Sequence, residues 1–391
     1  MQRNPTFFRK RIIIPFLEFI HNSKSVGILL LSCTAISLLL ANTSFALNYF
    51  AVINIEIPSI PIDAIHLPHT LLHWINDGLM AIFFFLAGME IKREVTKGEL
   101  SSFSQAILPV VAAIGGMVVP AIIFYFINKG TVFTNGWGIP MATDIAFSLG
   151  IAALLGSRVS LGLKIFLTAL AIIDDLGAIL AIAIFYSDSI HWIYLGVAAI
   201  IMLVLFLLMR FKIFNIVTLI LAILLWYCFF NSGIHATIAG VIVALFIPTD
   251  KLAKLEHALH TPVNFIIIPI FALANTAILL PGDIAGAIST TLNVGIVAGL
   301  VIGKPLGIFT ACFITVKCKW GTLPANTSWR HIIGAGLLAG IGFTMSIFIA
   351  TLAFKNAATI DIAKISALLG SFLSILFGIT WLRFFCKPLT A

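Results

Sequence analysis

Long apolar runs, each about twenty residues in length, follow one another along this chain. A helix needs about 20 mostly apolar residues to cross a hydrocarbon layer about 30 Å thick. The runs are continuous and rich in Leu, Ile and Ala, whereas the strands of a membrane β-barrel are shorter and alternate in polarity. We therefore expect an all-α polytopic membrane protein with twelve transmembrane helices. The predicted spans are 26–47, 72–91, 106–127, 137–156, 162–186, 191–209, 214–230, 233–248, 260–280, 292–316, 331–354 and 362–385.

The composition excludes several classes of protein. Apolar residues make up 61% of the chain and charged residues only 10%, against about 25% charged residues in ordinary soluble domains. A soluble globular enzyme, a disordered chain and a nucleic-acid-binding protein are therefore excluded. The five cysteines are scattered and form no CxxC motif, so we expect neither a disulfide framework nor a cysteine metal site. No cofactor is expected.

The basic residues predict the orientation in the bilayer. Of 23 lysines and arginines, 19 lie in the N-terminal tail, in every second loop or near the C-terminus. The intervening loops hold only Lys129, Lys355 and Lys364. Because cytoplasmic loops are the basic ones, we expect both termini in the cytoplasm. The predicted organisation is a cytoplasmic tail (1–25), one membrane domain (26–385) with an uncleaved first helix, and a short C-terminal tail (386–391).

Two segments outside the spans carry a pattern of their own. Residues 53–57 alternate between apolar and polar, and a Pro-Ser turn and residues 60–63 follow. This predicts an external β-hairpin at about 51–63, whose edge a second subunit would stabilise. An irregular loop is the alternative, because two prolines lie in the segment. Residues 11–20 are predicted to form a short interfacial helix.

Four charged residues lie within predicted spans. Asp144 falls in the fourth span, Asp174 and Asp175 in the fifth, and Lys304 in the tenth. Each charge at a helix centre costs about 2.5–3.5 kcal/mol on insertion scales, and such residues usually mark ion or substrate pathways. One buried ion pair would account for Lys304 and one aspartate, but not for two adjacent carboxylates.

The adjacent aspartates suggest a chemistry. Carboxylate oxygens are hard ligands that suit hard cations, and a metal ion requires the deprotonated form. A buried carboxylate therefore holds either a proton or a cation. If such a site opens alternately to the two sides of the membrane, it exchanges protons for cations, so the pattern predicts an antiporter.

The fourth and eleventh spans carry residues that interrupt helices. The fourth has Gly136, Gly138 and Pro140 before Thr143-Asp144, and four glycines lie between Gly334 and Gly342 in the eleventh. Unwound backbone is tolerated in a membrane where protein or a water-filled cavity surrounds it, although the eleventh-span glycines also suit close helix packing. Two interrupted spans in corresponding halves indicate inverted repeats and a transport site. Asp144 and Lys304 would then compensate the dipoles of crossing half-helices.

Several long motifs resemble the NhaA family of bacterial sodium/proton antiporters. They are Trp74-Ile-Asn-Asp-Gly-Leu-Met, Gly88-Met-Glu-Ile-Lys-Arg-Glu, Met141-Ala-Thr-Asp-Ile-Ala-Phe, Ala169-Leu-Ala-Ile-Ile-Asp-Asp-Leu-Gly-Ala, Gly233-Ile-His-Ala-Thr-Ile-Ala-Gly, Ile302-Gly-Lys-Pro-Leu-Gly and Gly340-Ile-Gly-Phe-Thr-Met-Ser. The likeness covers about residues 25–385.

The resemblance implies a fold and a site. It implies a core bundle of spans 3–5 and 10–12 (about 106–186 and 292–385). Spans 1–2 and 6–9 would form a panel through which a homodimer forms. It implies Asp174 and Asp175 as the Na⁺ and proton site. Thr143, Asp144 and Gly342 would lie at the helix crossing. Lys304 would be the charge partner, paired with Asp174.

The resemblance also implies an activity. A bacterial inner-membrane antiporter would expel Na⁺ or Li⁺ in exchange for two entering protons, driven by the inside-negative potential. The family is regulated by pH, and the positions that match its regulatory residues are Glu90, Arg93, Glu94, His235, Glu256, His257 and His260. Asp77 would line an external funnel. On residue type alone, Glu90 and Glu94 are as consistent with a solvated helix end, and we expect Glu256 in a loop.

Three other functions were weighed. An intramembrane aspartyl protease needs aspartates on separate helices and a GxGD-type motif, which this chain lacks. A cation channel has no need of a lysine beside its acids. A sodium-coupled solute symporter of similar fold is the remaining alternative.

Overall fold

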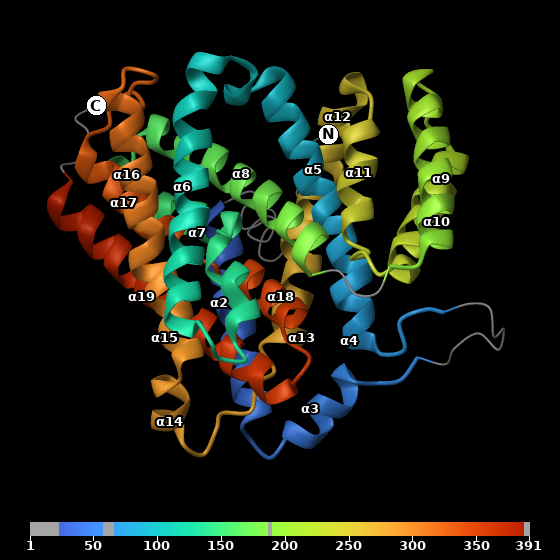
Figure 1. Ribbon diagram of the computed structural model, residues 1–391, viewed down its shortest axis with the longest axis horizontal. Coiled ribbons are helices and arrows are strands. Elements are labelled where there is room, and N and C mark those ends of the chain that lie inside the picture. The colour runs from blue at the N-terminus through green and yellow to red at the C-terminus, as the bar shows by residue number, and fades with distance from the viewer. Residues whose placement is uncertain (1–22, 58–65, 187–189, 387–391) are drawn as a thin grey trace, which may run out of the picture.

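The computed structural model describes residues 23–57, 66–186 and 190–386, and the structural statements below refer to these residues. The predicted interfacial helix at 11–20 lies outside them, as do most of both tails. The described chain is helical almost throughout (Figure 1). The elements of the first half are α2 (Ser23–Ala41), α3 (Ala46–Ile53), α4 (Leu71–His73), η2 (Trp74–Leu79), α5 (Met80–Lys97), η3 (Glu99–Ser101), α6 (Phe103–Asn128), η4 (Thr134–Met141), α7 (Ile145–Leu154), η5 (Gly156–Arg158) and α8 (Leu161–Phe185).

The second half continues in the same way. Its elements are α9 (Trp192–Arg210), α10 (Ile216–Ser232), α11 (Ile238–Phe246), α12 (Thr249–Pro262), η6 (Val263–Ile267), α13 (Ile268–Asn275), α14 (Ile284–Ser289), α15 (Thr291–Ala298), η7 (Gly299–Gly303), α16 (Lys304–Lys317), α17 (Trp329–Ala339), α18 (Phe343–Ala353) and α19 (Ala357–Phe385). In Figure 1, α9 and α10 stand together at one side of the molecule, and α16, α17 and α19 lie at the opposite side.

The number of membrane spans depends on how broken helices are counted. Seven helices in the described residues are long and apolar enough to cross a membrane, and the number rises to ten if each of three bent pairs is one span. Helices α10 and α11 coincide with the predicted spans 214–230 and 233–248, but they have only 17 and nine residues. The chain is thus an all-helical polytopic membrane protein with seven to ten spans by this measure.

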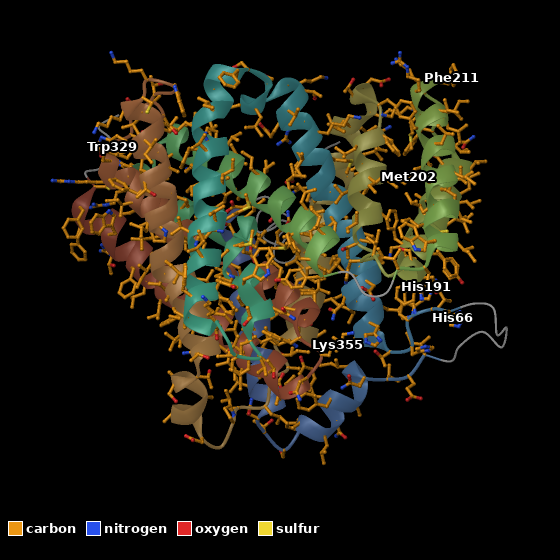
Figure 2. The ribbon with its side chains drawn as sticks, viewed as in Figure 1. His66, His191, Met202, Phe211, Trp329 and Lys355 are labelled. Carbon is orange, nitrogen blue, oxygen red and sulfur yellow. The ribbon has the colours of Figure 1, made fainter. Side chains whose placement is uncertain are left out.

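Successive connections lie at opposite ends of the helical bundle. Figure 2 shows Phe211 and Trp329 toward one end, and His66, His191 and Lys355 toward the other. The glycine pair Gly115 and Gly307 brings α6 and α16 into backbone contact, because a Cβ on either would lie 2.1–2.4 Å from the other's carbonyl oxygen. Close packing of this kind is typical of small residues at membrane helix interfaces. It holds α16, which begins with Lys304, against the core.

The predicted hairpin at 51–63 is wrong in its first strand. Helix α3 continues to Ile53, after a bend of 118° from the first helix. The alternating segment instead forms one antiparallel bridge, between Glu56 and Thr70, with Ile57 N–H donating to His69 O at 2.9 Å. The predicted second strand at 60–63 lies outside the described residues. Alternation over so few residues did not outweigh the helical continuation of the preceding apolar run.

Gly and Pro residues interrupt some spans and leave others continuous. Helix α6 runs unbroken through Pro109 and Pro120, so the third span is not interrupted. In the eleventh span, Gly334 and Gly336 lie inside α17 and pack against Leu382 and Pro305. The break comes only at Gly340–Gly342. Gly334 and Gly336 therefore allow close helix packing, whereas Gly340–Gly342 interrupt the helix.

Three of the spans contain a π-helical turn. These turns are η2, η6 and η7. The tenth span is one continuous helix from Thr291 to Lys317. Its π-turn, η7, lies just before Lys304. The ninth span begins at Thr249 rather than at the predicted residue 260, so Glu256 lies on a helix and not in a loop. π-turns in α-helices occur often at functional sites.

Candidate functional site

The fourth and eleventh spans are both broken, as predicted, and their breaks meet. The halves of the fourth span (η4 and α7) are bent by 40°, and those of the eleventh (α17 and α18) by 47°. The backbone N–H of Asp144 donates to the carbonyl of Ile341 at 2.7 Å. One irregular segment thus provides a hydrogen-bond partner for the other, as buried unwound backbone requires.

Asp144 joins the two half-helices that start at the crossing. It is the N-cap of α7 and accepts a hydrogen bond from Phe147 N–H at 3.0 Å. Its second carboxylate oxygen accepts from the backbone N–H of Thr344 at 3.2 Å and from the Thr344 hydroxyl. Thr344 lies in the first turn of α18. A single carboxylate, 3% exposed, therefore faces two helix N-termini, where a negative charge is favourable.

Gly342 precedes α18 and leaves no room for a side chain. A Cβ at this position would lie 2.1 Å from Ser346 Oγ and 3.1 Å from Leu300. Ser346 Oγ donates to the carbonyl of Ile139 at 2.7 Å. A larger residue at Gly342 would therefore disturb a hydrogen bond that ties α18 to η4.

Asp174 and Lys304 form a fully buried ion pair. Lys304 Nζ lies 2.9 Å from Asp174 Oδ2, and both side chains are 0% exposed. The same carboxylate oxygen accepts from the Thr143 hydroxyl at 2.7 Å. Lys304 Nζ also donates to the carbonyl of Met141, at the end of η4. The pair thus joins α8 and α16 to the break in the fourth span.

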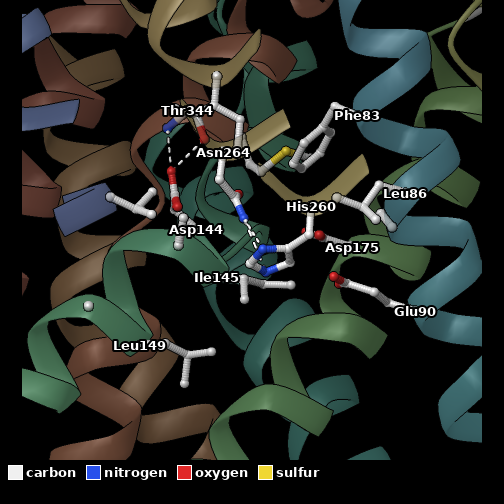
Figure 3. A pocket seen from close by; sticks show the side chains of 16 residues that line it. Phe83, Leu86, Glu90, Asp144, Ile145, Leu149, Asp175, His260, Asn264 and Thr344 are labelled. Carbon is white, nitrogen blue, oxygen red and sulfur yellow. Dashed lines mark hydrogen bonds between the residues drawn. The ribbon is translucent and has the colours of Figure 1, made fainter. Parts of the chain in front are cut away.

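Asp175 has a different environment from its neighbour. Its side chain reaches a cavity of about 160 Å³, whereas Asp174 does not line it. Asp144 and Thr344 also line this cavity, and the half-buried Glu90 faces it from α5 (Figure 3). Asp175 is 1% exposed, and its Oδ1 has no hydrogen-bond partner among the described residues. One carboxyl group of the adjacent pair is therefore neutralised by a lysine, and the other meets the cavity without a counter-charge of its own.

Four of the predicted pH-sensing residues gather at one end of α5. Arg93 contacts Glu94 at 2.9 Å and also forms an ion pair with Glu256 of α12. Glu90 lies one turn earlier on α5 and lines the cavity. Of these four residues, Glu90 is the one that borders the cavity beside Asp175.

The predicted histidines separate into different places. His257 and His260 are both exposed, but only His260 lines the cavity, where it contacts Asn264. His235 lies near the start of α11, where its Nε2 is 3.4 Å from an oxygen of Asp77. Thirteen residues of one continuous helix separate Asp77 from Glu90, which is about 20 Å at 1.5 Å per residue. His235 is thus grouped with the predicted funnel residue and not with the cluster around Arg93.

Sequence reasoning gave no role to three polar residues near the site. Thr344 belongs to a motif quoted above, and its place next to a broken helix was the available signal. Asn264 follows His260 by one turn, and no sequence signal set it apart. Tyr186 accepts a hydrogen bond from Gly138 N–H at 3.1 Å and donates to Asn135 O at 2.8 Å, so it ties the end of α8 to η4.

Comparison with known proteins identifies the family. The family model described as Na⁺/H⁺ antiporter 1 matches residues 17–382. The chain belongs to the NhaA family of Na⁺/H⁺ antiporters. It is 50% identical over 367 residues to Na⁺/H⁺ antiporter NhaA 2 of Flavobacterium johnsoniae, covering 92% of this chain and 90% of the relative. It is 49% identical to NhaA of Cytophaga hutchinsonii (95% and 96% covered) and 48% identical to NhaA 1 of Clostridium beijerinckii (95% and 95% covered). The resemblance seen in the motifs is thereby confirmed, and this NhaA-family chain is a transporter and not an enzyme.

Proposed function

We propose that this chain expels Na⁺ or Li⁺ in exchange for protons, and that Asp175 is the group at which the cation and the proton compete. The observation that carries this proposal is the contrast between the adjacent aspartates. Asp174 is paired with Lys304 in the closed interior, whereas Asp175 lines the cavity and forms no ion pair with another of the described residues. A carboxylate in that position binds a hard cation or a proton, but not both.

Asp174 and Lys304 supply the second exchangeable proton in this proposal. In one form of this step, an incoming proton binds to Asp174 and opens the ion pair. In the other form, the cation draws Asp174 away from Lys304, the lysine releases its proton, and the pair forms again when Lys304 is reprotonated. Two protons then enter for each cation expelled, so net positive charge moves inward and the membrane potential drives the exchange at about 2.3 kcal/mol per charge per 100 mV. The contacts of Thr143 and of Met141 with the pair would pass its opening to the broken fourth span.

The cavity favours an ion over an organic solute. Its volume of about 160 Å³ is small beside the roughly 300–1,000 Å³ of typical small-molecule pockets. The symporter alternative would need a larger space next to the site.

The wider architecture is part of the proposal. We expect twelve spans with inverted repeats, in which α10 and α11 are the two short spans, and a core of spans 3–5 and 10–12 that moves against the panel. Both termini would be cytoplasmic in a bacterial inner membrane. The charged cluster around Arg93 would regulate activity by pH. A second subunit would add a strand beside residues 55–57 to form a homodimer.

Exchange in everted membrane vesicles tests the proposal. The host lacks its own exchangers, respiration acidifies the vesicle interior, and a dye reports the pH difference when Na⁺ or Li⁺ is added. Wild type should dissipate the gradient, and Asp175→Asn should not. Asp250→Asn is the matched control, because Asp250 is exposed and forms a surface ion pair with Lys212. Activity of folded Asp175→Asn equal to wild type would refute the assignment, and Na⁺-driven solute uptake in place of exchange would support the symporter.

A further inference from the structure

Asn264 provides the one carboxamide among the side chains that line the cavity. It lies in the π-turn η6, between α12 and α13. Glu90, Asp144 and Asp175 give the cavity three carboxyl groups, and most of the remaining lining is apolar. Figure 3 shows Asn264 between the Asp144–Thr344 contact and His260. Its side chain therefore meets the same space as the proposed cation site.

The amide group of Asn264 has a defined orientation. Its Nδ2 lies 3.2 Å and 3.3 Å from the two ring nitrogens of His260, one turn earlier (dashed lines in Figure 3). The amide nitrogen is thus directed at the imidazole ring, and the carbonyl oxygen Oδ1 points away from it. Oδ1 accepts no hydrogen bond from another of the described residues. This oxygen is therefore free to accept a ligand.

A carboxamide oxygen and a carboxylate oxygen differ in what they bind. Both are hard oxygen ligands that suit a cation such as Na⁺. A carboxylate also binds a proton in the pH range in which proteins work, whereas a carboxamide has no acid–base equilibrium there. An amide oxygen in the cavity therefore favours a metal cation without adding a competing proton site.

We propose that Asn264 Oδ1 is a ligand for Na⁺ or Li⁺ in this cavity and raises the apparent affinity for the cation relative to the proton. The inference rests on the proposed function of Asp175. In this arrangement, the amide oxygen replaces part of the cation's hydration shell while Asp175 supplies the charge. Asn264 is a specificity-determining residue and does not carry a proton.

The variant Asn264→Leu tests this inference because it keeps the side-chain size and removes both polar atoms. Na⁺ binding to purified protein is measured by calorimetry, and the KM for Na⁺ is measured in everted vesicles. We expect the Kd and KM for Na⁺ to rise about three- to tenfold, the change that loss of one ordinary polar contact produces. Asn231→Leu is the control, since Asn231 lies at the end of α10 and bonds to the carbonyls of His66 and Tyr227.

A second pair of variants separates direct binding from an effect through His260. If Asn264 acts as a ligand, Asn264→Leu weakens Na⁺ binding in the His260→Ala background as well. If the amide only positions His260, the second substitution has no further effect in that background, and the inference is overturned. An unchanged Kd for Na⁺ in Asn264→Leu, with a wild type that binds and exchanges Na⁺, also overturns it. Failure of the wild type to bind or exchange Na⁺ would instead refute the proposed function, and this inference with it.

Discussion

Separation of the buried ion pair between Asp174 and Lys304 should destabilise the protein strongly. At 2.9 Å, two unit charges attract one another by about 6 kcal/mol at an effective dielectric constant of 20, and desolvation offsets much of this. Removal of one partner leaves the other charge buried, which costs about 3–5 kcal/mol. We therefore expect Lys304→Met and Asp174→Asn each to lower the free energy of unfolding by about that amount.

A double-mutant cycle isolates the contribution of the pair. The double variant removes both charges, so it should be less destabilised than the sum of the single variants by about 2–3 kcal/mol. The free energies are measured by denaturant unfolding of purified protein in detergent micelles. The pair Lys212–Asp250 is the control, because its side chains are 69% and 53% exposed and 3.7 Å apart. Such surface pairs contribute about 0–1 kcal/mol. A coupling energy near zero for the buried pair would refute the reasoning.

Three further predictions concern the segments around the site. Gly342→Ala should destabilise the protein by about 1–3 kcal/mol in the same unfolding assay, because the added methyl group would overpack this position. Gly196→Ala is the control and should be neutral or stabilising, because a Cβ there meets nothing within 4 Å. Tyr186→Phe removes the hydroxyl that bonds to η4 and should speed amide hydrogen exchange in residues 135–138, whereas Tyr125→Phe on the half-exposed face of α6 should not. Glu256→Gln removes the negative charge that pairs with Arg93, so we expect the pH profile of exchange in vesicles to move to lower pH. An unchanged pH profile would argue against a regulatory role for Glu256.

The main architecture was predictable because its causes are local in the sequence. Apolar runs of sufficient length define helices wherever they occur, and the cost of a buried charge marks Asp144, Asp174 and Lys304 without reference to partners. The breaks near Asp144 and Gly342 were predictable for the same reason, since Gly and Pro act on their own turn of helix. These features need only the chain and the bilayer.

The remaining features depend on contacts between distant segments. The ion pair of Asp174 with Lys304 came from the family resemblance, and its geometry needed the packing of both α8 and α16 against α6. The pairing of Asp77 with His235 joins two spans with no shared motif. The proposed role of Asn264 depends on its position in a π-turn, which no residue type specifies. Glu256 was placed in a loop because its segment is polar, but its α-helix simply extends beyond the apolar run.

The π-turns have a consequence for how this chain tolerates insertions and deletions. A π-turn accommodates one extra residue within a single wide turn, so its removal restores the regular helix and leaves the helix beyond it in almost the same rotational phase. If one residue were deleted from η7, Lys304 would still face Asp174, whereas the same deletion in the regular turns of α15 would rotate the lysine by about 100°. The π-turns are thus the places in these spans where a change of length by one residue leaves the two halves of the site in register.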